Sequence, residues 1–330
     1  MSSPHPPLIS LVIATYNRVA LLREALASIA ASALDRDDSV EVLVIDNNSH
    51  DGTAETVQAI REAGFRFALI YALETRQGTS HARNRGVALA RGRYLVFMDD
   101  DQRIDPHYLA NVPAVFAETG AACVGGPVHY YNATGIPRWL APLIEHIGQL
   151  DYGNATMVLD ESTGRLGGGN MALTRKALES FGGFDTRLGH HGTNLGGGED
   201  WEIQDRLMGA GKAVVYHPVL VQYHYLRPER FHKRYWRRLY YSYGRSLYLR
   251  GDWRGARLLF GVPRHLWWAL IMKDCPAWAK SWISFDYPKM FLRQLAIWQR
   301  FGKIAAARVE NRGPVRVTPP EQVRRLPRGD

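Results

Sequence analysis

The chain has 330 residues, and its hydrophobic content of 46% is enough for a sizeable core in one large domain or one domain with an appendage. Its two cysteines, Cys123 and Cys275, lie far apart, which argues against a disulfide framework or a zinc site and fits a reducing compartment. Residues 1–7 lack the basic and then apolar pattern of a signal peptide, and no run of about 18 uncharged apolar residues occurs. We therefore expect a cytoplasmic protein without a spanning helix.

The net charge of +9 is distributed unevenly along the chain. Residues 1–225 carry 18 Lys and Arg against 25 Asp and Glu, whereas residues 226–330 carry 23 against 7, so the net charges of the two parts are −7 and +16. An acidic front and a basic, aromatic back indicate two different tasks, and the back could face nucleic acid or an anionic membrane surface.

Strand and helix patterns alternate over the first hundred residues. Short apolar runs predict strands, and apolar residues at helical spacing predict helices. The strands are expected over residues 8–14, 40–45, 67–73 and 94–98, and the helices over residues 19–31, 53–63 and 79–90. This alternation is typical of a mostly parallel sheet with helices on both faces, and ligands bind such sheets at the carboxyl ends of the strands. Further strands are expected over residues 121–128 and 213–216, with a helix over residues 201–208. Residues 213–216 are expected to be the last strand, so residues 219–225, which include His224, would lie beyond it.

Polar clusters follow three of the predicted strands, at residues 15–18, 46–48 and 99–101. The last cluster is Asp99-Asp100-Asp101, and adjacent carboxylates repel one another unless a cation lies among them. Mg²⁺ and Mn²⁺ prefer carboxylate oxygens and bind substrate phosphates at the same time. The run therefore predicts a metal site that holds a phosphorylated substrate. The alternative is a solvated acidic turn.

The other two clusters suit a nucleotide. Asp46 could accept a hydrogen bond from a base or a ribose hydroxyl, and Thr15 and Arg18 could cradle the same nucleotide. Ordinary turn capping by Asp46 and Asn48 is the alternative. Arginine also suits bidentate phosphate contacts, and Arg83 and Arg85 differ by two positions on a predicted helix, so only one of them can easily face the site.

A second pair of carboxylates, Glu199-Asp200, follows three glycines and begins a predicted helix. Acidic residues stabilise a helix N-terminus, which is the simpler interpretation. The functional interpretation makes Asp200 a general base. His224 could complete a divalent-metal site, a role for which His190, His191 and His217 compete.

Taken in order, these motifs resemble those of the inverting family 2 glycosyltransferases with the GT-A fold. The matching stretches lie within residues 8–226 and are residues 12–18, 44–49, 78–86, 97–101, 168–172, 182–185 and 199–200. The resemblance implies an α/β GT-A catalytic domain over residues 1–228. A basic, aromatic helical region over residues 229–310 and a disordered tail over residues 311–330 would follow it.

The resemblance also implies roles for single residues. Asp200 would be the catalytic base with Glu199 in support, and Asp99, Asp101 and His224 would hold Mn²⁺ or Mg²⁺. The donor site would comprise Thr15, Tyr16, Arg18, Asp46, Asn48, Arg83, Asp99, Asp100, Gly169 and Asn170. Within it, Asp46 would contact the base, Asp99 would face the ribose, and Gly169 and Asn170 would line the sugar and acceptor pocket.

The implied reaction moves a sugar from a nucleotide-diphosphate sugar to an acceptor hydroxyl, in polysaccharide or glycolipid biosynthesis. A UDP-sugar is favoured, although GDP and dTDP donors also occur in the family, and the acceptor would be a saccharide or a lipid-linked molecule. The basic aromatic region suits the cytoplasmic face of an anionic membrane, and the alternative is a helical appendage that packs on the catalytic domain or on a second subunit of a homodimer. No nucleic-acid partner is expected. The competing functions are a nucleotidyltransferase and a non-catalytic protein that binds membrane or nucleic acid.

Overall fold

The computed structural model describes residues 6–34, 39–131, 136–137, 139–140, 150–191, 195–251, 253, 255–283 and 286–311. Contacts between residues divide the chain into two compact units, Met1–Tyr235 and Trp236–Asp330. Each unit is described by itself.

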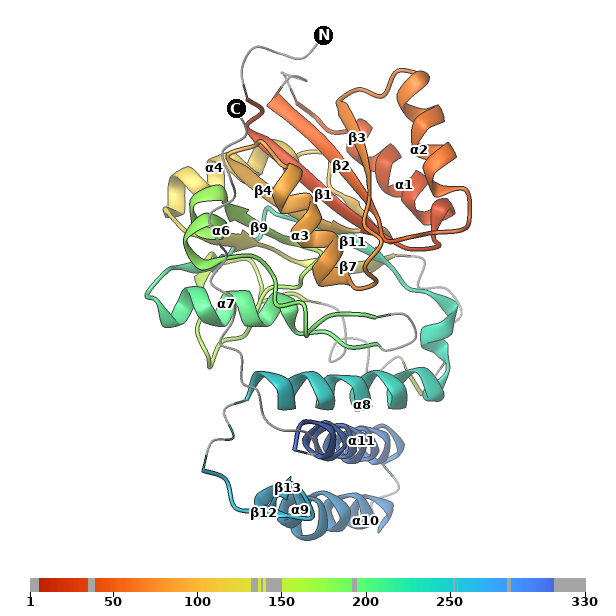
Figure 1. Cartoon of the computed structure of the whole chain (residues 1–330), viewed down its shortest axis with the longest axis vertical. Helices are drawn as coiled ribbons and strands as arrows, with labels where there is room; N and C mark the ends of the chain where they lie inside the picture. Colours follow the sequence, from red (N-terminus) through yellow and green to blue (C-terminus); the bar gives the residue numbers. More distant parts are fainter. Residues whose placement is uncertain are drawn as a thin grey trace. The chain divides into compact units, whose positions relative to one another are not determined.

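The first unit is built around an eight-stranded sheet (Figure 1). Its strands, in spatial order, are β3 (Ala68–Leu73), β2 (Val40–Asp46), β1 (Ile9–Thr15), β4 (Tyr94–Asp99), β9 (Met171–Thr174), β6 (Cys123–Gly125), β10 (Val214–Tyr216) and β8 (Met157–Val158). The first four are parallel, whereas β9 runs antiparallel between β4 and β6. The mostly parallel central sheet expected from the alternating pattern is confirmed.

Helices cover both faces of this sheet. They are α1 (Val19–Ala30), α2 (Thr53–Glu62), α3 (Thr79–Leu89), α4 (Tyr108–Thr119), α6 (Arg175–Phe181) and α7 (Glu199–Gly209). Successive residues of a strand point to opposite faces, so Leu11 packs in the same buried cluster as Leu22 of α1, and Val12 in the same cluster as Ala82 of α3. Burial on both faces explains why the strands are uninterrupted apolar runs.

A small three-stranded sheet lies next to the end of β4. It consists of β5 (Gln102–Ile104), β11 (Gln222–Tyr225) and β7 (Val128–Tyr131). The single strand expected over residues 121–128 is wrong, because the chain leaves β6 at Gly126-Pro127 and enters a different sheet as β7. A Cβ atom at Gly126 would lie 2.4 Å from the carbonyl oxygen of Leu220, and proline has no N–H to donate to a ladder. Strand β11 lies beyond the strand that the sequence analysis expected to be the last, and the sequence analysis did not identify α4 or β5 either.

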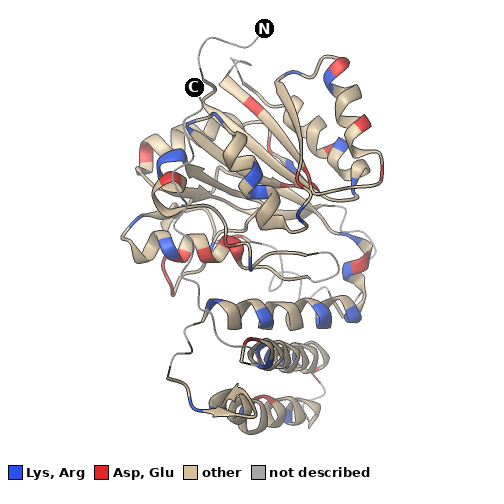
Figure 2. Ribbon diagram, viewed as in Figure 1, with Lys and Arg blue, Asp and Glu red and all other residues tan. Residues whose placement is uncertain are grey.

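The second unit is helical, with one short hairpin. Its elements are α8 (Lys233–Arg250, which begins in the first unit), β12 (Leu258–Leu259), β13 (Val262–Pro263), α9 (Arg264–Ala269), a π-helical turn (Leu270–Asp274), α10 (Cys275–Ile283) and α11 (Tyr287–Glu310). Helices α8 and α11 touch at Gly244 and Gly302, where an added Cβ atom would lie 1.9 Å from a carbonyl oxygen of the other helix. Basic residues recur along α8 (Figure 2). Apart from Asn311, the expected tail lies outside the described residues.

In the part of the chain that the structure describes, no helix has the length and apolar character needed to cross a membrane.

Candidate active site

Strand register brings the polar clusters of the sequence together at one edge of the sheet. Thr15 at the end of β1 pairs with Asp46 at the end of β2, and Ala14 pairs with Asp99 at the end of β4. The carboxyl ends of these parallel strands therefore present their following loops side by side. Helix α3 and the N-terminus of α7 add the remaining charged groups to this edge.

Asp100 is buried and bound by the loop that follows β1. The guanidinium group of Arg18 donates to its Oδ1 atom over 2.8 Å, and the Thr15 hydroxyl donates to its Oδ2 atom over 2.9 Å. Burial raises the pKa of Asp100, and the neighbouring Asp101 charge adds to this, although Arg18 opposes both. Thr15 and Arg18, which were expected to cradle a nucleotide, are thus engaged with an aspartate, whereas Tyr16 between them is 40% exposed.

Asp101 is buried among two arginines and a histidine. Its Oδ1 atom lies 3.2 Å from Nε2 of His224, and its Oδ2 atom lies 3.2 Å from Nε of Arg227 and 3.7 Å from Arg18. Burial alone would raise the pKa of Asp101, but the attraction of His224, Arg18 and Arg227 outweighs it and holds this pKa well below its usual range. The cations that separate the three aspartates are therefore side chains of the protein itself.

His224 lies on β11, opposite Gln102 of β5, and not beyond the last strand as the sequence analysis placed it. Arg227 follows it by three residues and was missed, because a lone arginine after a strand carries no motif. Among the described residues, no three His, Cys, Asp or Glu side chains lie close enough together to form a metal site as they stand.

Arg83 joins the run of three aspartates to the Glu199-Asp200 pair. It is buried in α3, and its guanidinium group donates to Oδ1 of Asp99 and to Oε1 of Glu199, over 2.9 Å in each case. The side chain of Asp99 is 36% exposed, whereas that of Glu199 is buried. Arg85 is exposed, so one of the two arginines faces the site, as their spacing predicted.

Glu199 and Asp200 form a proton-binding pair at the start of α7. Burial raises the pKa of Glu199 to about 7, the Asp200 charge adds to this and Arg83 opposes it. Burial likewise raises the pKa of Asp200, whose oxygens accept from the backbone N–H groups of Gly168 and Trp201, over 2.9 Å in each case. Oε2 of Glu199 is buried and has no hydrogen-bond partner among the described residues. A carboxyl pair with raised pKa values can accept a proton near neutral pH.

Two glycines, Gly168 and Gly169, let the loop before β9 approach Asp200 and Asp99. A Cβ atom at Gly168 would lie 2.9 Å from Oδ2 of Asp200, and one at Gly169 would lie 2.7 Å from Oδ2 of Asp99. Gly169 therefore borders the site. Asn170 does not offer its side chain to a ligand, because it is fully buried and bonded to the Tyr108 hydroxyl and to the carbonyl oxygens of Pro127 and Leu220.

At the end of β2, Asp46 is occupied by local contacts. It accepts from the Tyr71 hydroxyl and from the backbone N–H of Ser49, over 2.8 Å in each case. The turn-capping interpretation of Asp46 is thus correct for its Oδ1 atom. Asn48 has a left-handed backbone with φ of 68°, which asparagine tolerates. Its neighbour Asn47, which the sequence analysis passed over, is buried and bonds the backbone of Glu74, Arg76 and Gly78.

His190 lies in the electrostatic field of the same site. Surrounding protein atoms and the nearby Arg18, Arg227 and Arg83 lower its pKa to about 4, against an opposing effect of Asp99. The imidazole is therefore neutral at physiological pH. The sequence analysis named His190 as a competitor of His224, whereas it is His224 that contacts Asp101.

Comparisons with known proteins identify the family and the fold. The chain is 28% identical to the succinoglycan biosynthesis protein ExoM of Rhizobium meliloti over 212 residues. This match covers 64% of each protein, which is less than two thirds of the length of ExoM. Its structure resembles a mannosyltransferase from Pyrobaculum calidifontis solved with GDP-Man and Mn²⁺, with a TM-score of 0.58, 20% identity and coverage of 93% and 88% of the two chains.

It also resembles residues 1–349 of Staphylococcus aureus TarS solved with UDP-GlcNAc, with a TM-score of 0.53, 18% identity and coverage of 71% and 66%. These structures support the GT-A fold. The model of glycosyl transferase family 2 matches residues 10–182, which is more than half of the chain. The chain belongs to glycosyl transferase family 2.

Proposed function

We propose that this protein is an inverting glycosyltransferase that moves a sugar from a nucleotide-diphosphate sugar to an acceptor hydroxyl. The observation that supports this most strongly is the Arg83 bridge, which joins Asp99 at the end of β4 to Glu199 at the start of α7 through two contacts of 2.9 Å. A donor site and a proton acceptor would then lie on the two sides of one arginine.

In the proposed reaction, the acceptor hydroxyl gives its proton to Asp200 while its oxygen attacks the anomeric carbon. The bond from that carbon to the diphosphate breaks, and the nucleoside diphosphate leaves with the electron pair. Because attack and departure occur on opposite faces, the anomeric configuration inverts. The raised pKa of Asp200 makes its carboxylate more basic than that of an ordinary aspartate, and Glu199 is coupled to it.

The donor would lie along the carboxyl edge of β1, β2 and β4. Tyr16 is exposed there, and Asp46 and Asn48 follow β2, where a base would lie. Arg18 and Arg83, which now contact carboxylates, would have to bind the phosphates of the donor as well. A UDP-sugar is the favoured donor, since TarS was solved with one, although the Pyrobaculum mannosyltransferase was solved with GDP-Man.

Mn²⁺ or Mg²⁺ fits the donor set of this edge. Two ligands at right angles on one such ion lie ~3 Å apart, because each is ~2.1 Å from the metal. Asp101 and His224 are separated by 3.2 Å. Asp99 is partly exposed at the end of β4, and it would have to turn from Arg83 toward this pair to complete the site. When bound, the ion would neutralise the charge that develops on the leaving diphosphate. Asp99, Asp101 and His224 are the residues proposed to hold it.

The acceptor is proposed to be a saccharide or a lipid-linked molecule in polysaccharide or glycolipid biosynthesis, in keeping with the name of ExoM. The test begins with thermal shifts of UDP-, GDP- and dTDP-sugars with Mn²⁺, Mg²⁺ or EDTA. A shift that one nucleotide gives and EDTA removes would support the donor and metal sites. The variant Asp200→Asn should then retain this shift while sugar transfer falls at least ~100-fold.

The matched control is Glu202→Gln, which removes a carboxylate from the surface of the same helix. It should leave both the shift and the rate unchanged. Unchanged transfer by Asp200→Asn would refute the assignment of the base. Well-folded protein that no nucleotide sugar stabilises would refute the donor site.

A further inference from the structure

The second unit contains a helical segment whose solvent-exposed side carries a stripe of apolar residues. Residues 264–283 form one continuous helical segment through α9, the π-helical turn and α10. Apolar side chains recur along it at helical spacing and are exposed. We call the following residues the apolar stripe: Trp268, Ile271, Met272, Ala279, Trp282 and Ile283. Trp268 is 64% exposed and Ile283 is 79% exposed.

The opposite face of this segment is the buried one, although it carries polar groups. Leu266 and Leu270 are buried there, and so are Asp274 and Ser281. Asp274 accepts from the guanidinium group of Arg300 over 2.8 Å, which satisfies its charge. A surface helix of a globular protein normally exposes a polar face, so the exposed apolar stripe indicates that this face contacts something other than water.

The hairpin β12–β13 extends the same surface. Phe260 at its tip is 79% exposed and has a left-handed backbone with φ of 53°, which is rare for a bulky residue and costs free energy. The indole of Trp267 donates to the carbonyl oxygen of Leu259 over 3.1 Å, and the backbone N–H of Arg264 donates to the carbonyl oxygen of Arg257 over 2.8 Å. The hairpin is thereby fixed against α9.

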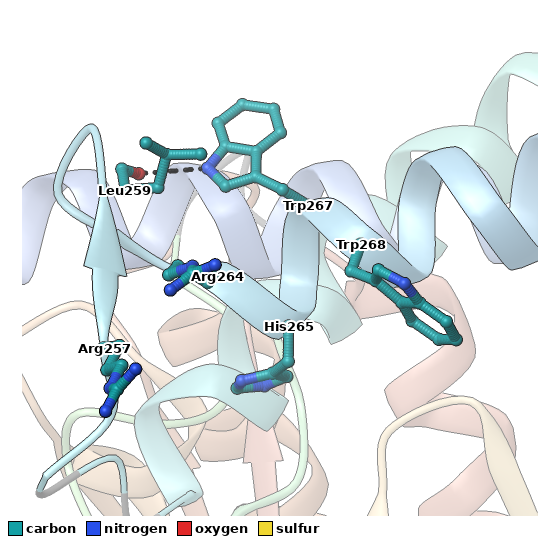
Figure 3. A pocket seen from close by; sticks show the side chains of 6 residues that line it. All are labelled: Arg257, Leu259, Arg264, His265, Trp267 and Trp268. Carbon is teal, nitrogen blue, oxygen red and sulfur yellow. Dashed lines mark hydrogen bonds between the residues drawn. The ribbon is translucent and has the colours of Figure 1, made fainter.

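A pocket of about 510 Å³ lies where the hairpin meets the stripe (Figure 3). It is lined by Arg257, Leu259, Arg264, His265, Trp267 and Trp268. Figure 3 shows Arg257 at the foot of the hairpin, Arg264 between the hairpin and the helix, and His265 below the helix. Two guanidinium groups beside indole rings suit a phosphate that carries an apolar chain.

Charge favours an anionic partner. Arg257, Arg264, Lys273 and Lys280 are all exposed, and Asp274 is the single acidic residue in the sequence between positions 255 and 283. In a symmetric contact between two copies of this face, these cations would approach one another and repel. Anionic phospholipids would attract them, and tryptophan and basic side chains are favoured at the depth of lipid headgroups.

We propose that the apolar stripe, the hairpin tip and the pocket between them form a docking surface for a bilayer that contains anionic phospholipids. The indoles and isoleucines enter the boundary between headgroups and acyl chains, and Arg257 and Arg264 bind a lipid phosphate in the pocket. This binding does not depend on the sugar-transfer reaction proposed above.

Co-sedimentation of the full chain with vesicles tests the proposal. The protein should bind phosphatidylcholine vesicles that contain phosphatidylglycerol and bind pure phosphatidylcholine much more weakly. The variant with Trp268, Ile271, Trp282 and Ile283 all changed to serine should bind at least tenfold more weakly. Arg257→Glu with Arg264→Glu should lose at least about 25-fold, since each basic residue contributes about fivefold near an anionic surface.

Two controls remove comparable groups elsewhere. Val309→Ser removes an exposed apolar side chain of α11, which is 66% exposed, and Arg61→Glu with Lys176→Glu reverses two exposed cations of the first unit. Both should bind vesicles as the wild type does. Circular dichroism and unfolding midpoints establish that each variant is folded.

Three outcomes would overturn the proposal. The wild type could fail to bind either kind of vesicle, or the serine variant could bind as tightly as the wild type. The wild type could also be a dimer by sedimentation velocity that the serine variant converts to a monomer, without binding vesicles. That last outcome would assign the stripe to a second copy of the chain.

Discussion

The buried carboxyl of Glu199 makes the stability of the first unit depend on pH in a defined direction. Its pKa is about 7 in the folded protein, against about 4.5 in an unfolded chain. Between these two values the folded state binds more protons than the unfolded state, so this group destabilises the fold as the pH rises through that window. A difference of about 2.5 pH units corresponds to about 3 kcal/mol, an upper figure because Asp200 titrates with it.

Glu199→Gln keeps the shape of the protonated side chain and removes its titration. The variant should match the wild type near pH 4.5 and should exceed it by about 2–3 kcal/mol at about pH 8.5. Urea unfolding followed by circular dichroism at a series of pH values measures this difference. The control is Glu202→Gln, whose carboxylate binds Arg206 over 2.7 Å at the surface of the same helix, and it should not stabilise the protein at any pH.

The opposite result would refute the reasoning. If Glu199→Gln were less stable than the wild type at about pH 8.5, the ion pair between Glu199 and Arg83 would outweigh the cost of burying the carboxylate. A difference that did not change with pH would mean that Glu199 is ionised throughout, and the proposed proton-binding pair would reduce to Asp200 alone.

Three further substitutions test the geometry of the site. Gly169→Ala places a Cβ atom 2.4 Å from the Gln102 amide and 2.7 Å from Asp99, so the loop must shift. Calorimetry with the donor and Mn²⁺ should then show at least tenfold weaker binding in protein that still folds. Asn170→Ala removes three buried hydrogen bonds and should cost about 3 kcal/mol of unfolding free energy in urea titrations. Arg83→Lys cannot reach both carboxylates with a single ammonium group, so steady-state kinetics should show a fall in kcat of at least tenfold.

The sequence predicted which polar residues lie at the carboxyl edge of the sheet, because the signals for this are local in the chain. Each polar cluster directly followed an apolar strand, and parallel strands share a carboxyl edge, so Asp46 and Asp99 could be placed together without coordinates. The break between β6 and β7 was missed because an apolar run that contains Gly126-Pro127 still scores as one strand. The exposure of the apolar stripe in the second unit could not be predicted, since periodicity shows that an apolar face exists and not whether it is covered.

What the sequence could not supply is the pairing of charges within the site. Asp99, Asp100 and Asp101 are adjacent in the chain, yet they contact different side chains that come from different elements. These partners are Arg83 of α3, Arg18 after β1, and His224 and Arg227 in and after β11. Strand β4 ends at Asp99, and Asp100 and Asp101 form the turn before β5, so the three side chains point in different directions. Only the tertiary fold decides which group each of them meets. A ligand that takes Asp99 must therefore compete with Arg83, and Arg83 also holds Glu199. A ligand bound at the sheet edge would in this way change the contacts of the Glu199-Asp200 pair on α7 through the side chain of Arg83 alone, without a movement of the backbone.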